Sequence, residues 1–542
     1  MLTPRIRIAV APAAEYEIHR PLFDMLSAGL AVAFVPHASE QYGGIHGVIS
    51  LSEDQGLAEE VTKNGLGLYQ FHSANLFTPS PESKIAVSSS TSLHRAFRNS
   101  NLADSSISRW SRVPHSPEIL AEVENNPVWS VVRNNRIETH HVGVELPVFS
   151  SSDLFHQHFR AARWFALLPL LHFLRYLLGP EGWRSPEPRA TFIIDDPNLH
   201  HRSYGFIDFA ALAKHAALHN YHATIATVPL DAWYFNRDVA AFFRAHTDRI
   251  SLMMHGVNHI ADELARNYSE HQALGLLADG LRRINAFESR SAVKVDRVMA
   301  APHGAFTDPI ADPMLRLGYE AGCVSAGSLI RWNPKKRWSP DLGFPVVQAM
   351  GTRAFPVFHR VGPNEVDIRL SAFLGHPIIV ATHHQDFVEN FARIEAIAGL
   401  VNEVASPRWM TIADISRTNY VACREQDLLC VKPFTRRLVI PLTSEIKTVR
   451  LLDSPFGSES ILNLAVIASG GSANSYQTDH VKCSLSDKIL EIMLPPDHLI
   501  DFATVKGVPL GLWPVARRLL AEVRDRAKPM LAFAELGDRR HS

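Results

Sequence analysis

Residues 191–197 read TFIIDDP, and this stretch decides both the expected fold and the expected place of the site. Its first four residues favour a buried strand, and the proline ends that strand. Two acids directly after a buried run, Asp195 and Asp196, need an explanation, because an unpaired carboxylate is costly to bury. They either cap the turn that follows the strand or form a catalytic or metal-binding pair.

A second polar motif, HGVNH, follows the apolar run at 250–254 and contains His255 and His259. One carboxylate and two imidazoles are a typical ligand set for a catalytic divalent metal with open positions. If the chain enters a helix here, both imidazoles lie on one face of it. The alternative for such a pair is an ordinary helix surface. In the metal interpretation Asp196 is the carboxylate ligand, and Asp195 is left to handle a proton.

The region around both motifs alternates between strand and helix patterns. Strands are predicted at 190–194, 223–228, 250–254, 295–300, 319–324 and 377–382, and helices at 206–219, 238–246, 262–287 and 387–404. Repeated βα units predict a parallel sheet, either open or closed into a barrel. Functional side chains then belong at the carboxyl ends of strands, and both motifs lie at that end of the sheet.

A turn and an aromatic loop are further candidates for contacts with a substrate. Pro302, His303 and Gly304 follow the predicted strand 295–300. Such a turn either presents backbone N–H groups to an oxyanion or is an ordinary turn. Trp332 lies in a loop of basic and aromatic residues, where its ring can stack on a sugar ring. The simpler interpretation of that loop is a solvated surface.

Two adjacent histidines, His383 and His384, follow the predicted strand 377–382. A histidine at a strand end can serve as a general acid. Because neighbouring side chains of a strand point to opposite faces, only one of the two can face the site. We favour His383, with His384 as the alternate acid, and a buried, hydrogen-bonded histidine is the competing interpretation.

Residues 1–180 predict a separate Rossmann-like α/β domain. Its apolar runs, which alternate with helical patterns, lie at 5–11, 31–36 and 47–51. A long helix at 153–178 is predicted to end the domain, and a serine-rich segment at 88–112 is predicted to be a mobile loop or an insertion. No G-x-G-x-x-G follows the first strand, so nucleotide binding is not supported.

The sequence predicts a central domain at residues 185–425. After it, the pattern of residues 430–542 predicts a small, mainly-β domain. Short apolar runs separated by Gly, Ser, Asp and Pro lie at 437–441, 448–452, 461–468, 481–485 and 489–494. A helix at 514–527 is predicted to close the chain.

Charge and cysteine content narrow the functional classes. The 542-residue chain has 54 basic and 55 acidic residues, so neither nucleic acid nor an anionic membrane is an expected partner. Its four cysteines form no Cys-x-x-Cys pair, which disfavours a thiolate zinc site and fits a reducing compartment. The most apolar stretch, 164–178, is too short and too polar to span a membrane. We expect a cytoplasmic protein, because the N-terminal apolar run is too short for a secretion signal.

The order of these motifs resembles that of the NodB-type polysaccharide deacetylases, which are carbohydrate esterases of the family 4 type. The resemblance covers roughly residues 190–420. It implies a distorted (β/α) barrel that uses a divalent metal, with zinc as the first candidate, to remove acetyl groups from N-acetylated sugars. By motif position it implies that the general base is Asp195, that the general acid is His383, and that the metal ligands are Asp196, His255 and His259.

The sequence departs from the family pattern near the base. In the family, an arginine two positions before the proline of the third motif orients the base, and here that position is Ala300. Arg297 is near, but it would point to the opposite face of the strand. Ile193 and Ile194 precede the acids, where the family usually has Thr-Phe. We therefore expect a divergent, multidomain member that acts on an amino-sugar-containing glycan.

Two alternatives to this function stay open. The first is a metal-dependent amidohydrolase that acts on a small cytosolic C–N substrate. The second is a non-catalytic carbohydrate-binding protein on a decayed deacetylase scaffold. Metal content and acetate release discriminate among the three.

Overall fold

The computed structural model describes residues 6–538, apart from 39–41, 75, 81–82, 135–136, 180–181, 457–463, 468–472, 477–478, 484–487 and 495–497. The chain divides into two compact units. The first unit comprises Met1–Arg184, Arg337–Pro345 and Arg369–Leu374. The second comprises Ser185–Lys336, Val346–Ile368 and Gly375–Ser542.

The first unit contains a mixed sheet of nine strands, in the order β2-β1-β3-β4-β9-β8-β7-β5-β6. Five parallel strands form one part of it: β1 (Ile6–Ala11), β2 (Val32–Pro36), β3 (Gly47–Ser50), β4 (Gly67–Phe71) and β9 (Ile137–Val142). The antiparallel strands are β8 (Asn126–Asn134), β7 (Glu118–Val123), β5 (Lys84–Val87) and β6 (Ser100–Ala103). Two helices alternate with the first strands, α1 (Ala13–Leu30) and α2 (Gln55–Lys63).

The serine-rich segment 88–112 is in part a strand of this sheet rather than only a loop. It contains β6, which pairs with β5 in an antiparallel register. Alternating burial along β6 explains the pairing, because Ser100 and Leu102 are buried while Asn101 and Ala103 are exposed.

The helix predicted at 153–178 is broken. Its two pieces are α3 (Phe155–His158) and α4 (Leu168–Leu178). Between them, the Asp104 carboxylate accepts hydrogen bonds from the backbone N–H groups of Trp164 (2.8 Å) and Phe165 (2.7 Å). These two N–H groups therefore donate to a side chain and not to the carbonyls of a preceding helical turn, and the helix is interrupted.

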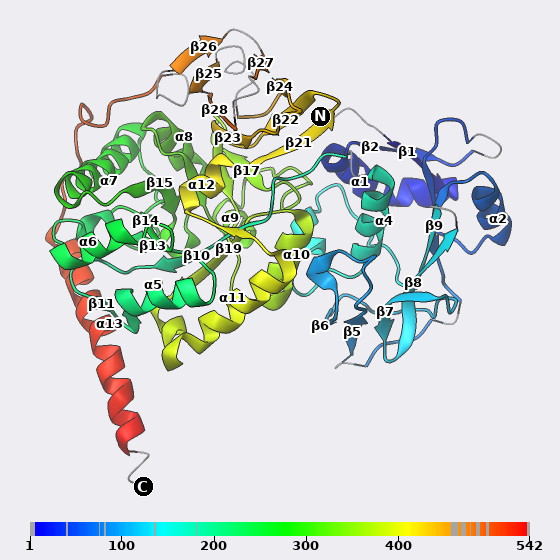
Figure 1. Ribbon diagram of the computed structural model, residues 1–542, viewed down its shortest axis with the longest axis horizontal. Helices are drawn as coiled ribbons and strands as arrows, with labels where there is room; N and C mark the ends of the chain where they lie inside the picture. The colour runs from blue at the N-terminus through cyan, green and yellow to red at the C-terminus, as the bar shows by residue number, and fades with distance from the viewer. Residues whose placement is uncertain are drawn as a thin grey trace. The chain divides into compact units, whose positions relative to one another are not determined.

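The second unit is built on seven parallel strands that alternate with helices (Figure 1). In sheet order they are β18 (Phe355–Phe358), β16 (Ala321–Cys323), β15 (Val295–Ala300), β14 (Ile250–His255), β13 (Ala223–Thr227), β10 (Arg189–Asp195) and β19 (Ile378–His383). The antiparallel β17 (Val347–Met350) lies beside β18, and β20 (Arg408–Trp409) pairs with β10. Helices around these strands include α5 (Phe209–Leu218), α6 (Arg237–Ala245), α7 (Glu270–Ser291), α8 (Asp308–Arg316) and α11 (Ala392–Ala405).

A β-bridge joins β19, at one end of this strand order, to the segment just after β18, at the other end. Val361, just past β18, pairs in parallel with Val380 of β19. The Val361 N–H donates to the Ile379 carbonyl, and the Val361 carbonyl accepts from the Ala381 N–H, each at 2.9 Å. The predicted α/β class with parallel βα units is confirmed, and the sheets of the molecule are mixed.

The last part of the second unit contains two four-stranded sheets. One is formed by β21 (Tyr420–Glu425), β22 (Leu428–Pro433), β24 (Thr448–Leu451) and β27 (His480–Lys482). The other is formed by β23 (Arg437–Pro441), β28 (Ile489–Met493), β25 (Leu464–Ile467) and β26 (Ala473–Tyr476). The predicted runs at 461–468 and 481–485 fall partly outside the described residues.

The terminal helix α13 (Leu512–Asp538) is longer than the predicted 514–527 segment. Among the residues that the structure describes, no helix combines the length and the apolar character that crossing a membrane requires.

Candidate active site

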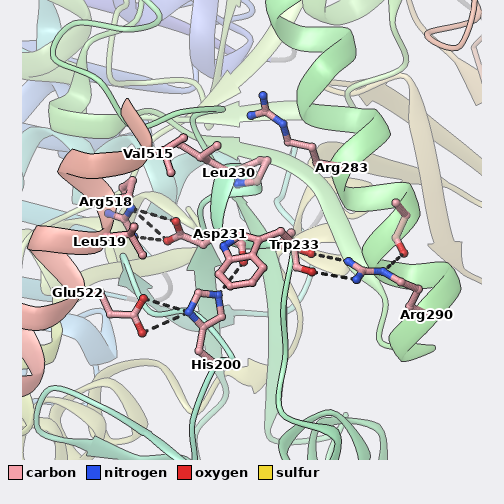
Figure 2. A pocket seen from close by; sticks show the side chains of 13 residues that line it. His200, Leu230, Asp231, Trp233, Arg283, Arg290, Val515, Arg518, Leu519 and Glu522 are labelled. Atoms are coloured by element: carbon pink, nitrogen blue, oxygen red, sulfur yellow. Dashed lines mark hydrogen bonds and ion pairs between the residues drawn. The ribbon is translucent and has the colours of Figure 1, made fainter. Parts of the chain in front are cut away.

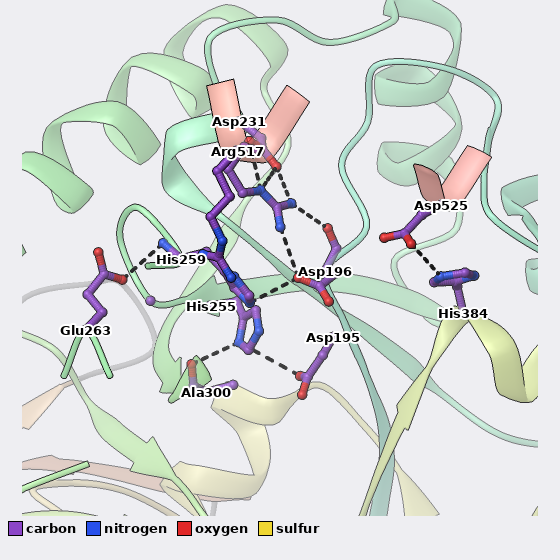
Figure 3. Close-up of polar contacts among 12 residues, drawn as sticks. Asp195, Asp196, Asp231, His255, His259, Glu263, Ala300, His384, Arg517 and Asp525 are labelled. Carbon is purple, nitrogen blue, oxygen red and sulfur yellow. Dashed lines mark hydrogen bonds and ion pairs between the residues drawn. The ribbon is translucent and has the colours of Figure 1, made fainter. Parts of the chain in front are cut away.

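Asp196, His255 and His259 come together at the carboxyl ends of β10 and β14 (Figure 3). One ligand atom of each lies within 4.8 Å of the others, and Asp196 Oδ1 is 3.1 Å from His259 Nε2. His255 Nδ1 donates to the Ala300 carbonyl at 3.1 Å, which leaves the lone pair on Nε2. A carbonyl that fixes the tautomer in this way is typical of histidines that bind metals.

A turn, and not a helix, brings His259 back to His255. The chain bends at Gly256 and His259, which have positive φ angles of 61° and 53°, and α7 begins only at Glu270. The buried carboxylate of Glu263 accepts the backbone N–H groups of Val257 (2.8 Å), Asn258 (2.8 Å) and His259 (3.2 Å). The helix that would have put both imidazoles on one face is not formed here, and the turn held by Glu263 brings them together instead.

The charge states of these three side chains suit a bound cation. Burial lowers the pKa of both His255 and His259, so both imidazoles are neutral at neutral pH. Burial raises the pKa of Asp196, but the Arg518 guanidinium, which donates to its Oδ1, outweighs burial and holds the pKa below its ordinary range. Two neutral imidazoles and a carboxylate are the donor set of a catalytic divalent metal.

The other acid, Asp195, is held by an arginine. Only 3% of Asp195 is exposed, and Arg360 Nη1 donates to its two oxygens at 3.1 and 2.9 Å. Burial raises the pKa of Asp195, but the charge of the Arg360 guanidinium outweighs burial and keeps the pKa below its usual value. Asp195 is therefore a charged, fixed carboxylate beside the cluster of Asp196, His255 and His259, with its Oδ1 3.9 Å from His255 Nδ1.

Arg360 is a functional residue that the sequence reasoning missed. Ala300 stands at the position expected for an orienting arginine, and it contributes its carbonyl to His255. Arg360 reaches Asp195 from the segment between β18 and the Val361 bridge. The signal was present, because Arg360 follows the apolar run 355–358 just as the acids follow their own strand.

Of the two adjacent histidines, His383 lies beside Asp195. The two residues are register partners of β19 and β10, and partners in a parallel pair point to the same face. The His383 side chain is exposed, whereas His384 is buried. The His384 ring stacks on Phe206 at 5.9 Å and turns its Nε2 toward Asp525 of α13, 3.5 Å away (Figure 3).

The predicted proline–glycine turn forms a short 3₁₀ segment, Pro302–Gly304, after β15. His303 has a φ of 56°, and its ring centroid lies 5.3 Å from that of His259. The Gly304 N–H donates to the Ala301 carbonyl at 3.0 Å, so it is committed to the turn. The His303 N–H is therefore the candidate backbone donor of this turn to an oxyanion.

A cavity of about 370 Å³ opens on Asp196, His259 and His303. Trp513 of α13 also lines it. Trp332, the predicted aromatic contact, ends α9 (Ala326–Trp332) and is not among the described residues that line this cavity. The aromatic face available to a substrate here is Trp513, which the motif-based reasoning did not single out.

Charged side chains on one face of α13 pair with residues of other elements of the second unit (Figure 2). Arg518 Nε is 3.1 Å from Asp231 Oδ2, and Arg518 Nη1 is 3.1 Å from Asp196 Oδ1. One turn later, Glu522 accepts from His200 Nδ1 at 3.0 Å. A second cavity, of about 390 Å³, lies among these pairs. The helix thus places a guanidinium directly on Asp196, one of the three candidate metal ligands.

Comparison with known proteins gives a structural likeness only. No protein-family model matches the chain, and no curated protein is similar to it in sequence. The structure is similar to a family 4 carbohydrate esterase from Streptomyces lividans in complex with acetate (11% identity, TM-score 0.25, 41% of this chain and 91% of that chain). It is also similar to a putative polysaccharide deacetylase from Mycobacterium smegmatis (12%, 0.31, 44% and 94%) and to the peptidoglycan deacetylase PdaC from Bacillus subtilis (10%, 0.25, 43% and 92%).

These proteins are carbohydrate esterases and deacetylases, the class that the motif order resembles. At such TM-scores the likeness carries no argument about activity, which rests on the geometry of the site.

Proposed function

We propose that this chain is a metal-dependent hydrolase that removes N-acetyl groups from amino-sugar-containing glycans. The observation that carries the proposal is the convergence of Asp196, His255 and His259 beside a buried carboxylate that an arginine holds. The glycan substrate is what the resemblance of the motif order to that of the NodB-type polysaccharide deacetylases implies. We also propose that the seven parallel strands form a distorted (β/α) barrel, which the backbone bridge between β19 and the segment after β18 supports.

The donor set fits a divalent cation of the zinc class. Three protein ligands, two of them imidazoles, leave an open coordination position, as catalytic zinc sites do. Arg518 and His259 both contact Oδ1 of Asp196, and the carboxylate offers Oδ2 as a second donor. A cation bound to Oδ2 would therefore leave the Arg518–Asp196 ion pair in place.

The residues around the cluster have separate roles in the proposed reaction. A divalent cation bound here would polarise the acetamide carbonyl and lower the pKa of a water molecule. Asp195 is placed to accept the proton of the attacking water, and Arg360 keeps its carboxylate in one orientation. The His303 N–H is the candidate donor to the oxygen on which negative charge develops. His383 would give a proton to the leaving nitrogen.

Acetate release from the purified chain tests this proposal. N-acetylated glycans are expected to yield acetate, and small N-acyl amides to yield little. Dialysis against a chelator should remove the activity, and added Zn²⁺ should restore it. Release from the small amides alone would favour the amidohydrolase alternative. No acetate from any substrate in the presence of metal would overturn the proposal.

A non-catalytic carbohydrate-binding protein is the second candidate, and the Arg518–Asp196 ion pair favours it. A guanidinium on this carboxylate partly neutralises the charge that would attract a cation. Such a protein would bind a glycan equally well before and after chelation, and titration calorimetry distinguishes that result from metal-dependent hydrolysis.

Replacing Arg360 by glutamine is expected to lower kcat/KM by about 10- to 100-fold and to move the acid limb of the pH profile to higher pH. Arg360 lowers the pKa of Asp195 while burial raises it, so without the guanidinium the base becomes protonated at a higher pH. Arg360→Lys keeps a positive charge and is expected to shift the limb less. An acid limb that does not move in Arg360→Gln would show that Asp195 is not the titrating base.

A further inference from the structure

We propose a second divalent-metal site between α5 and α11, formed by His215, His219 and Glu395. One ligand atom of each lies within 4.8 Å of the others. Within the described part of the chain, three such side chains converge only here and at the candidate active site. The cluster lies where α5 leads into the amino end of β13, whereas the active site lies at the carboxyl ends of strands. The proposal is therefore independent of the proposed function.

The two histidines can share one ion because a helical turn separates them. His215 is in the last turn of α5, and His219 is the residue that caps it. Positions four apart on a helix lie one above the other. The His219 N–H donates to the His215 carbonyl at 2.9 Å, and the ring centroids are 4.1 Å apart with an interplanar angle of 28°.

His215 has the orientation and charge state of a metal ligand. Its Nδ1 hydrogen-bonds to the Tyr221 hydroxyl at 3.0 Å, and the Phe391 ring packs edge-on against it at 5.1 Å. Its Nε2 is buried and has no hydrogen-bond partner among the described residues. Burial and the nearby His219 lower the pKa of His215, so the ring is neutral. With the proton on Nδ1, a bound cation would satisfy the otherwise unpaired nitrogen.

Glu395 supplies the negative charge and an oxygen donor from a second helix. It lies in the first turn of α11, and its Oε1 is 3.7 Å from His219 Nδ1. Asn402, further along α11, donates to the carbonyls of His219 and Asn220 at 3.1 Å each, so the two helices already meet here. Two imidazoles and a carboxylate suit Zn²⁺, Ni²⁺ or Cu²⁺ better than Mg²⁺ or Ca²⁺. A bound ion would link α5 to α11 and stabilise the folded chain.

Zinc binding to the full-length His259→Ala variant tests this site, because that substitution removes a ligand from the candidate active site. We expect calorimetry to show one remaining Zn²⁺ and a rise in Tm when Zn²⁺ is added. Adding His219→Ala, or replacing the exposed Glu395 by glutamine (Glu395→Gln), should weaken this binding at least ~100-fold and remove the rise in Tm. Adding Tyr221→Phe, which frees the His215 ring, should weaken it roughly 10- to 100-fold.

His246→Ala is the matched control. His246 caps α6 as His219 caps α5, but its ring stacks on Phe242 and its Nδ1 donates to the Phe242 carbonyl at 2.9 Å. This variant should bind Zn²⁺ like its parent. Equal binding by the His219→Ala and His246→Ala variants would overturn the proposal, and so would an His259→Ala chain that binds no Zn²⁺. If His259→Ala does not fold, the His219→Ala single variant gives the same test, because its bound metal should fall from two ions to one.

Discussion

Asp195→Asn is expected to lower kcat about 10²- to 10⁴-fold while the chain keeps its metal. The carboxamide has nearly the shape of the carboxylate but cannot accept a proton from water. The ligands Asp196, His255 and His259 are unchanged, so metal affinity should stay within a few-fold of the wild type. Acetate release and elemental analysis on the same sample measure both quantities.

The control for this variant is another buried acid that lies away from the site. Asp296 is near the amino end of β15, and its Oδ2 accepts the Ala413 N–H at 3.0 Å. Burial raises the pKa of Asp296 to about 7, so Asp296→Asn removes only part of a charge at neutral pH, and at this distance from the site it should leave kcat unchanged. An Asp195→Asn chain that retains kcat to within about tenfold would show that Asp195 is not the general base.

The strands that carry the site could be predicted because each is a segment of five or more residues in which apolar side chains predominate. β10, β13, β14, β15 and β19 lie within about two residues of their predicted bounds. β18 was missed because it has only four residues, FPVF, and contains a proline. Arg360 was missed for the same reason, because the rule that functional residues follow strands needs the strand first.

Spacing along the chain predicted that Asp196, His255 and His259 converge, but the partners of these side chains come from distant parts of the sequence. His255 and His259 are four positions apart in the sequence, so one turn can bring them together. Arg360 lies 165 positions from Asp195, and Arg518 lies 322 positions from Asp196. Periodicity reports only local structure, and it contains no information about which distant cation a buried carboxylate meets.

Helix α13 shows why an apolar pattern does not by itself decide which face is buried. Leu512, Leu520 and Val523 are 89%, 64% and 67% exposed, although an apolar stripe on a helix normally packs on a core. The buried face instead carries Arg518 and Glu522, which find charged partners in the second unit. Ion pairs with Asp231 and His200 therefore fix the orientation of this helix, and no rule of hydrophobic periodicity predicts that.

His255→Ala is expected to lose metal binding at the active site and activity together. His255 is buried, its Nδ1 is fixed by the Ala300 carbonyl, and its Nε2 is one of three donors. Removing it should weaken Zn²⁺ binding by more than ~100-fold and lower kcat/KM to the level of the chelated wild type. Calorimetry with Zn²⁺ and acetate release on the same preparation measure both losses.

His222→Ala is the matched control, because His222 is an equally buried histidine at the amino end of β13. Its Nε2 pairs with Ser251 Oγ at 2.9 Å and its Nδ1 with the Asp248 carbonyl at 3.2 Å, at the opposite end of the strands from the candidate active site. The His222→Ala variant should lose stability but keep the ion at the candidate active site. Because the proposed second site is intact in His255→Ala, metal content should fall by one ion and not to zero. Wild-type Zn²⁺ affinity at the active site in His255→Ala would overturn the ligand assignment, whatever the activity.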